Sequence, residues 1–589
     1  MKNMPFTLRS SFFVLRSAFC VLFAFSGFAD DASDLRAARA VFEQNLAAIR
    51  NRDRDAYLAV YLKSDKLVRT GPAGFATGYE SFAKGAGSGW PDTIEATDVR
   101  LTPIRPGLVY GSYRYRVQYG AEEHSGISER LFVETPDGWK VALTGAVDTP
   151  GIPPSPRAIT GATLIDGRGG APVKNATVIV RDGKIECAGA DCAVPAGIDV
   201  VDARGMWITP GLVDAHVHFS QTGWADGRPD ALDLRAQHPY ETTIAELRAN
   251  PARFAHSFLC SGITSVFDVG GYPWTLKLHE QADNSWPHVT AAGPLLSTAD
   301  HWLNLPAERQ FIHLSSEDAA RGGVRYLAAQ GAKAIKVWYL DENQFVAAAG
   351  DETAKAKLPL IVHATELAVA KSAIRAGAKL LVHSVWDMPI DDEFIALLKE
   401  RQTILTPTLT VARGYVRMFE SVVSRKAPAI DDPNKCVDAK TIAKLQSTAS
   451  VDASVVTAAQ VERRSARTAD RERVAAANLK RLVDAGIPIA TGTDSGNPLT
   501  LHGPAIYGEM EAMQAAGMTP MQVLVSSTAT AARAARVDDV TGTLEKGKEA
   551  DLLILAADPS ADVANFRKVR SVMRGGVLRS IRDLSALAQ

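Results

Sequence analysis

The segment 207–219, WITPGLVDAHVHF, is the part of this chain that most restricts its fold. Its apolar and β-branched residues are typical of a buried strand, which ends in two histidines separated by one valine. Because successive side chains of a strand point to opposite faces, His216 and His218 lie on one face and Val217 on the other. Two imidazoles at a strand's end suit a metal ion, although a histidine pair that only caps the strand is the alternative.

From this segment onward, short apolar strands alternate with amphipathic helical patterns. Eight strands, most of them followed by a helix, predict an α/β fold built on a (β/α)8 (TIM) barrel over residues 207–538. The polar, helix-prone stretch 413–468 is an insertion after the seventh strand, either a lid or a surface excursion. Strands are expected at 208–219, 262–269, 289–296, 332–340, 358–364, 379–385, 403–410 and 487–493, and helices at 318–330, 366–376, 391–401 and 471–485.

Strand-rich segments flank the predicted barrel on both sides. Residues 158–206 contain short strands separated by DGRGG and DGK, and residues 539–589 contain GTLEKGKEADLLIL and VRSVMRGGVL. Segments at the two ends of a barrel can pair with each other, so we expect one small, discontinuous β-sandwich.

The first part of the chain has a different plan. Residues 30–149 place two helical patterns before a series of alternating strands, which predicts an α+β domain. This order resembles the cone-shaped ketosteroid isomerase superfamily (SnoaL-like). The proline-rich residues 150–157 form a stiff linker to the rest of the chain.

Residues 1–29 are expected to be a secretory signal peptide. Lys2, Arg9 and Arg16 precede or interrupt an apolar run that closes with small residues at Gly27 and Ala29. The run is short for a membrane anchor. Cleavage after Ala29 would leave a secreted, periplasmic protein with no integral membrane segment.

Composition excludes some classes of partner and leaves others open. The formal net charge of -1 argues against nucleic acid as the partner. Of five cysteines, Cys187 and Cys192 are close enough in sequence to pair in an oxidising compartment. Cys260 falls in a helical pattern and Cys436 in the polar insertion, so we expect no disulfide framework. Whether the chain forms a homo-oligomer is left open.

Polar residues gather where the predicted barrel strands end, which is where such barrels place their sites. His216 and His218 end the first strand, His363 the fifth (LPLIVHATE), His383 the sixth (KLLVHSVWD) and Asp494 the eighth (IPIATGTDSGN). Lys336 lies in the fourth strand among apolar residues, where an unpaired ammonium is costly to bury. A single histidine at a strand end is most often structural, but six such residues on one rim favour a site.

These residues resemble the metal-dependent amidohydrolase superfamily, in its imidazolonepropionase-related and prolidase-like branch. The similarity covers residues 158–578, and its most specific marks are PGLVDAHVHF, VHATE, GTDSGNP and the return segment ending in ADLLIL. The resemblance implies two divalent metal ions, with zinc the first choice, and carbon dioxide bound as a carbamate on Lys336. His216, His218 and Asp494 would then hold one ion, His363 and His383 the other, and Lys336 would bridge both.

The resemblance also implies the chemistry. A hydroxide that bridges the two ions attacks a polarised carbonyl, and Asp494 moves the proton to the leaving nitrogen. His301, in the loop after the third strand, and Tyr339, three residues after Lys336, are weaker catalytic candidates.

We therefore expect a hydrolase of carbon–nitrogen bonds that acts on an amide, a cyclic amide or a dipeptide-like small molecule. Three alternatives remain: a mononuclear deaminase or cyclic-amide hydrolase, a dinuclear lactonase, and an inactive binding protein. The substrate, the leaving group and the role of the N-terminal domain are not determined by the sequence.

Overall fold

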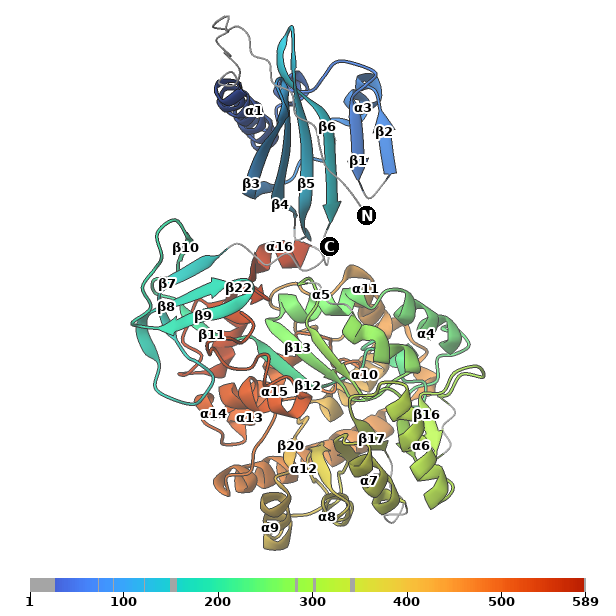
Figure 1. Cartoon of the computed structure of the whole chain (residues 1–589). Coiled ribbons are helices and arrows are strands. Elements are labelled where there is room, and N and C mark those ends of the chain that lie inside the picture. Colours follow the sequence, from blue (N-terminus) through green and yellow to red (C-terminus); the bar gives the residue numbers. More distant parts are fainter. Residues whose placement is uncertain are drawn as a thin grey trace, which may run out of the picture. The chain divides into compact units, whose positions relative to one another are not determined.

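The computed structural model of the chain describes residues 27–71, 74–87, 89–120, 122–148, 156–280, 284–299, 303–338 and 345–586 (Figure 1). The chain divides into two compact units: residues 1–119 with 123–149, and residues 150–589 with 120–122. Residues 1–26 of the predicted signal peptide and 150–155 of the predicted linker lie outside the described residues.

In its described residues, the first unit has three helices and a six-stranded sheet in the order β2-β1-β6-β5-β4-β3. Its apolar core lies where α1 contacts β3, β4 and β6, and includes Phe42, Tyr61 and Phe132. Strand β1 is parallel to β6 and antiparallel to β2, and β5 and β6 form an antiparallel pair. The elements are α1 (Gly27–Arg50), α2 (Arg54–Ala59), β1 (Val68–Gly71), β2 (Gly74–Thr77), α3 (Tyr79–Gly85), β3 (Thr93–Arg105), β4 (Leu108–Tyr119), β5 (Glu122–Thr135) and β6 (Gly138–Asp148).

In the second unit, one eight-stranded sheet joins the two segments that flank the rest. Strand β21 pairs antiparallel with β11, so residues from the end of the chain lie beside residues from 157–210. Apolar side chains of both segments, among them Ile159, Ile208 and Ile554, pack into one core. The strands are β7 (Arg157–Leu164), β8 (Val173–Arg181), β9 (Lys184–Gly189), β10 (Asp199–Asp202), β11 (Trp207–Pro210), β21 (Leu552–Leu555), β22 (Val569–Arg574) and β23 (Val577–Ser580).

The remaining strands are parallel and form two sheets, β12-β13-β14 and β16-β15-β17-β18-β19-β20. The expected eighth strand, 487–493, has only isolated parallel bridges, from Ile489 to Leu405 and, just beyond it, from Ser495 to Val217. The fold is mixed α/β, and the closed barrel stays a prediction. The strands are β12 (Leu212–Val217), β13 (Ile263–Asp268), β14 (His288–Ala291), β15 (Leu295–Ser297), β16 (Phe311–His313), β17 (Ile335–Trp338), β18 (Leu360–His363), β19 (Ala378–Val382) and β20 (Ile404–Thr406).

Helices cover these parallel strands, and their ends follow local sequence signals. Thr519 begins α14 with a reciprocal capping box to Gln522, and Pro520 occupies the first helical turn. The helices are α4 (Tyr240–Ala249), α5 (Ala252–Cys260), α6 (Glu317–Ala329), α7 (Val346–Lys355), α8 (Leu367–Arg375), α9 (Asp392–Arg401), α13 (Ala505–Ala515), α14 (Pro520–Ser526), α15 (Ala529–Ala535) and α16 (Ile581–Ala586), with 3₁₀ turns η1 (Ala225–Gly227), η2 (Pro273–Glu280) and η5 (Val563–Lys568).

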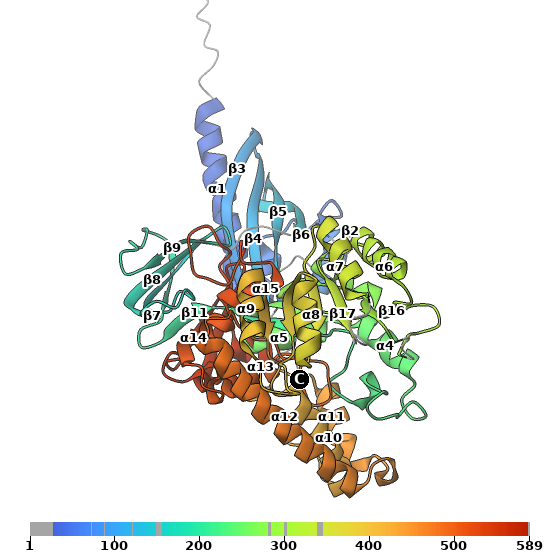
Figure 2. The same cartoon turned by 90° about the horizontal axis from the view of Figure 1, so that it is seen from below.

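The predicted insertion is a helical subdomain whose apolar side chains, such as Phe419 and Leu445, form one cluster with Trp224 of the segment that follows β12. In Figure 2, α10 and α12 lie side by side, and the two helices are in contact. A capping box between Thr457 and Gln460 begins α12, which is therefore longer than the helix expected at 471–485. The elements are α10 (Val411–Ser424), α11 (Ala439–Gln446), η3 (Ser447–Ser450), η4 (Ala453–Val455) and α12 (Ala458–Asp484).

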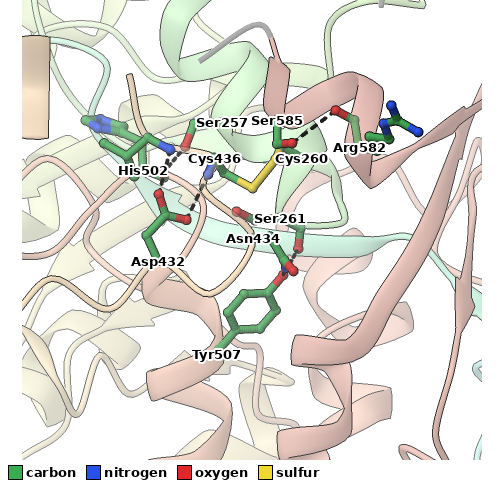
Figure 3. Close-up of a disulfide and its surroundings, with 11 residues drawn as sticks. Ser257, Cys260, Ser261, Asp432, Asn434, Cys436, His502, Tyr507, Arg582 and Ser585 are labelled. Carbon is green, nitrogen blue, oxygen red and sulfur yellow. Dashed lines mark hydrogen bonds between the residues drawn. A yellow bond between two sulfur atoms is a disulfide. The ribbon is translucent and has the colours of Figure 1, made fainter. Parts of the chain in front are cut away.

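Two disulfides correct the expectation that no framework forms. Cys187 pairs with Cys192, and Cys260 at the end of α5 pairs with Cys436 in the insertion, 176 residues away (Figure 3). Asp432 accepts a hydrogen bond of 2.8 Å from the backbone N–H of Cys436 and so fixes the insertion side of this link. Because the two cysteines meet only through tertiary packing, their spacing in the sequence carries no signal of the pair.

None of the helices in the described part of the chain is long and apolar enough to cross a membrane.

Candidate active site

His216, His218 and Asp494 bring three ligand atoms together inside the second unit. The two Nε2 atoms are 3.3 Å apart, and Asp494 Oδ1 lies 3.3 Å from that of His216 and 3.0 Å from that of His218. Asp494 Oδ1 accepts no hydrogen bond within the described ranges. Ligand atoms at about 2.0–2.2 Å from a tetrahedral ion lie roughly 3.5 Å from one another. The spacing and the donor types therefore fit a divalent metal ion.

The protonation of the histidines also fits this role. His218 Nδ1 donates a hydrogen bond of 2.6 Å to the carbonyl oxygen of Gly270, which leaves the Nε2 lone pair directed to the cluster. Burial lowers the pKa of His216 well below its ordinary value and that of His383 to about 4. Neutral imidazole is the form that binds metal.

The other predicted ligands lie beside this cluster. His363 ends β18 and His383 directly follows β19, and their ring centres are 4.4 Å apart. His383 is also 5.0 Å from the ring of His216. Lys336 on β17 is 1% exposed, and burial lowers the pKa of its ammonium to about 7, against the opposing pull of the Asp494 carboxylate. All six predicted ligands line one cavity of about 790 Å³.

Two of these residues have a left-handed backbone, which is uncommon for residues other than glycine. His383 has φ of 75° and Asp494 has φ of 58°. Backbone hydrogen bonds hold both, from His383 N–H to Thr406 and from Asp494 N–H to the carbonyl of His216. Such conformations concentrate at functional sites, where the surrounding structure compensates their cost.

The weaker candidates His301 and Tyr339 lie outside the described residues.

Three buried groups that sequence reasoning missed hold the histidine segment in place. Asp214 accepts hydrogen bonds from the backbone of His216 and from Thr493, next to Asp494. Asp268 accepts from the backbone N–H groups of Phe219, which follows His218, and of Gly270, whose carbonyl oxygen accepts from His218. His502 Nε2 donates to the carbonyl oxygen of His218 at 3.0 Å. Asp214 lies within the recognisable PGLVDAHVHF segment, whereas the other two carry no motif.

A second group of missed residues forms the wall beside Asp494. Asn497 Oδ1 accepts hydrogen bonds from the guanidinium of Arg228 and, at 2.5 Å, from the hydroxyl of Tyr415. Asp230 holds the other edge of Arg228 through hydrogen bonds of 2.8 and 2.7 Å. A guanidinium fixed from two sides is a rigid positive group at the edge of the cavity.

A second cluster, of His288, Glu549 and Asp551, is not a metal site of the same kind. Arg574 Nη1 lies 2.7 Å from Glu549 Oε2 and 3.5 Å from Asp551 Oδ1, so a guanidinium already supplies the positive charge. His288 Nε2 lies 3.0 Å from Asp551 Oδ2. The cluster joins β14 to the strands β21 and β22 as an ion-pair network.

Comparison with known proteins supports the same interpretation. A sequence model of the Amidohydrolase family matches residues 207–579. The ochratoxinase of Aspergillus niger is 26% identical over 458 residues, which are 70% of this chain and 85% of that protein. The imidazolonepropionase of Idiomarina loihiensis is 38% identical over 90 residues, 15% of this chain and 21% of that protein.

Solved structures resemble the second unit in fold. A Xaa-Pro dipeptidase with bound methionine has a TM-score of 0.55 at 21% identity and covers 72% of this chain and 100% of its own. The A. niger ochratoxinase structure has a TM-score of 0.53 at 23% identity and covers 72% of this chain and 95% of its own.

The family model spans more than half of the chain and contains all six residues that the fold brings to one cavity. The chain therefore belongs to the amidohydrolase family and is a hydrolase that acts on carbon–nitrogen bonds.

Proposed function

We propose that this hydrolase uses two divalent metal ions, with zinc the first choice, to cleave an amide of a dipeptide-like or N-acyl amino acid substrate. The observation that carries the proposal is the contact of His216 Nε2, His218 Nε2 and Asp494 Oδ1 within 3.3 Å of one another. With both imidazoles neutral and their Nε2 lone pairs facing the carboxylate, a shared cation would balance these buried electron-rich atoms.

The proposed ligands divide into two groups. His216, His218 and Asp494 would hold one ion, and His363 and His383 the other. Lys336 would bridge them as a carbamate formed with carbon dioxide. Because burial lowers the pKa of Lys336 to about 7, a substantial fraction of its amine is neutral near neutral pH, and the neutral amine is the form that reacts with carbon dioxide.

Bound ions of this kind polarise a carbonyl and lower the pKa of a water molecule. The side chains of the protein would transfer protons and exclude water. Asp494 lies next to both imidazoles and can take a proton from the attacking water and deliver it to the leaving nitrogen. Trp338 and Trp386 line the same cavity and would exclude water from the reacting groups.

Metal content is the experiment that tests this proposal. We expect about two metal ions per chain by elemental analysis of protein purified without chelators, and fewer in Lys336→Ala. Asp494→Asn should retain most of its fold but lose turnover of dipeptides and N-acyl amino acids. One ion per chain that Lys336→Ala does not change would reject the dinuclear site and favour a mononuclear deaminase or cyclic-amide hydrolase.

We also propose that the protein is secreted to the periplasm after cleavage of residues 1–29. Two disulfides support an oxidising compartment, because such bonds are rare in the cytosol. Protein sequencing of the mature N-terminus tests this, and a start at Asp30 is expected.

The first unit is proposed to be a SnoaL-like domain. Support comes from its order of elements, with α1 and α2 before the sheet and α1 packed against β3, β4 and β6. Expression of residues 30–149 alone, followed by structure determination, tests this assignment.

A further inference from the structure

Four arginines of α12 line the same cavity as the six proposed metal ligands. These residues, Arg463, Arg464, Arg467 and Arg471, are called the arginine row below. Positions 464, 467 and 471 follow helical spacing and so share one face of α12. At 1.5 Å per residue, the row extends for roughly 10 Å along the helix, long enough to contact two anionic groups.

The arginine row lacks acidic partners among the residues that the structure describes. Within the described ranges, none of its four guanidinium groups forms an ion pair with a carboxylate. Other cations of α12 are paired, such as Arg473 with Asp470 at 3.4 Å and Lys480 with Asp484. Burial, followed by repulsion from Arg467 and Arg471, lowers the pKa of Arg464 against the opposing effect of Tyr415. Like charges three or four positions apart also destabilise a helix.

Aromatic side chains connect the arginine row with the proposed metal site. The guanidinium of Arg471 lies over the ring of Trp386 at 5.2 Å, and Trp386 lies 6.3 Å from the ring of His383. Arg464 lies over Phe419 at 4.6 Å, and Phe419 also lines the cavity. All four arginines are exposed to solvent, and aromatic rings of the cavity wall lie beneath the guanidinium groups of two of them, Arg464 and Arg471.

Few negative charges line this cavity. Asp230 is paired with Arg228, and Asp494 belongs to the proposed metal cluster, which leaves Glu366 as the other carboxylate of the lining. The four arginines of the row therefore outnumber this one carboxylate, and the outer cavity carries a net positive charge.

We propose, on the basis of the function proposed above, that the arginine row binds carboxylate groups of the substrate away from the scissile bond. The substrate class is then an acidic amide, such as an N-acyl amino acid or dipeptide with one or two free carboxylates. The row acts in substrate binding and specificity, and its members are not catalytic residues. Guanidinium groups suit this role because they bind carboxylates through two parallel hydrogen bonds.

A charge series tests the proposal with the metal-loaded, full-length enzyme. N-benzoyl-L-glutamate, N-benzoyl-L-glutamine and N-benzoyl-L-glutaminamide have almost the same shape and carry two, one and no carboxylates. We expect kcat/KM to fall by about tenfold across the series, and Arg467→Gln/Arg471→Gln to remove most of this preference through KM. Raising the salt concentration should increase KM for the glutamate compound in the wild type and much less in the variant.

Arg473→Gln is the matched control. Arg473 is on the same helix with a side chain 74% exposed, and it does not line the cavity. The control should behave as the wild type with all three compounds. An equal loss for acidic and neutral compounds in Arg467→Gln/Arg471→Gln, or no charge preference in the wild type, would overturn the proposal.

Binding measured by calorimetry separates this proposal from the proposed function. One outcome is that the enzyme binds these compounds without hydrolysing them. In that case, tighter binding of N-benzoyl-L-glutamate than of the neutral compound, lost in Arg467→Gln/Arg471→Gln, would support carboxylate binding by the arginine row and reject hydrolysis of these amides. If all three compounds are hydrolysed at equal rates, the proposed function stands and carboxylate binding by the arginine row is rejected.

Discussion

The hydroxyl of Thr493 donates a hydrogen bond of 2.6 Å to the carboxylate of Asp214, which ties the strand of His216 to the segment of Asp494. The same carboxylate accepts from the backbone N–H of Thr493 at 2.9 Å and of His216 at 3.2 Å. Asp214 is fully buried, and this burial raises its pKa to about 7 against the opposing effect of these donors. One side chain thus sets the distance between two proposed ligands that are far apart in sequence.

Replacing Asp214 should therefore weaken the proposed metal site without touching a ligand. For Asp214→Ala we expect metal affinity to fall by about 10–100-fold, the usual effect of losing a group that orients ligands. Competition with a chelator of known affinity measures this. Thr493→Ser keeps the hydroxyl and should bind metal as the wild type does, whereas Thr493→Val should lose affinity. Unchanged affinity in Asp214→Ala would contradict this positioning role.

Gly492 is the next position at which a small change should disturb His216. A Cβ atom there would lie 2.8 Å from His216 Cβ, 2.9 Å from His216 N and 2.4 Å from Thr406 Cγ2. We expect Gly492→Ala to destabilise the protein by about 1–3 kcal/mol and to reduce metal content, because packed neighbours must move. Thermal unfolding and elemental analysis test both effects.

Gly508→Ala is the control for that substitution. Gly508 lies inside α13, and a Cβ atom at this position meets nothing within 4 Å. Alanine should stabilise the helix there by up to about 1 kcal/mol. Loss of stability in Gly508→Ala, or no loss in Gly492→Ala, would show that the room for a Cβ atom does not determine the change in stability at these positions.

Reduction of the link between Cys260 and Cys436 should loosen the insertion that carries the arginine row. This disulfide closes a loop with a sequence separation of 176 residues, for which the loss of chain entropy on cross-linking gives up to about 5 kcal/mol. For Cys260→Ser/Cys436→Ser we expect a lower thermal inactivation temperature and a higher KM.

The other disulfide provides the comparison. Cys187 and Cys192 have a sequence separation of only 5 residues, which gives about 2 kcal/mol by the same relation. Cys187→Ser/Cys192→Ser should therefore cost less stability and leave KM unchanged. A larger loss in this variant than in Cys260→Ser/Cys436→Ser would refute the ranking.

The network of His288 should make stability depend on pH. Burial and Arg574 lower the pKa of His288, but the interactions with Asp551 and Glu549 together outweigh them, so its pKa in the folded protein is raised above the ordinary value of about 6.5. Its stabilising effect is complete below the unfolded pKa and is lost as pH rises through the folded pKa. His288→Gln should therefore lower Tm more at pH 5.5 than at pH 8.5. Calorimetry at both pH values tests this sign.

Removal of metal should abolish hydrolysis and lower Tm, because an ion that binds only the folded protein stabilises it. Activity should return on addition of zinc, and faster with bicarbonate, since the proposed bridge needs carbon dioxide on Lys336. Lys336→Ala should gain nothing from bicarbonate. Full activity of protein shown by elemental analysis to be free of metal would reject the proposed mechanism.

The sequence predicted the elements whose signals are local. The segments around Lys336 and His363 form strands within the expected ranges, because their apolar pattern is a local signal. The strand expected at 208–219 is divided into β11, which pairs with β21, and β12, which pairs with β13. Helices α6, α8 and α9 likewise begin and end within a residue or two of expectation. All six proposed ligands were found in this way, since each lies in or beside a recognisable strand or motif.

Tertiary structure alone decided the relationships between distant segments. The pairing of Cys260 with Cys436, the support of His218 by His502, and the position of Arg471 over Trp386 all join residues whose spacing in the sequence carries no pattern. The expected eighth strand has only isolated bridges, and Asp494, which follows it, has a left-handed backbone. Local propensity thus determines which helices and strands form, and long-range packing determines which of their side chains come into contact.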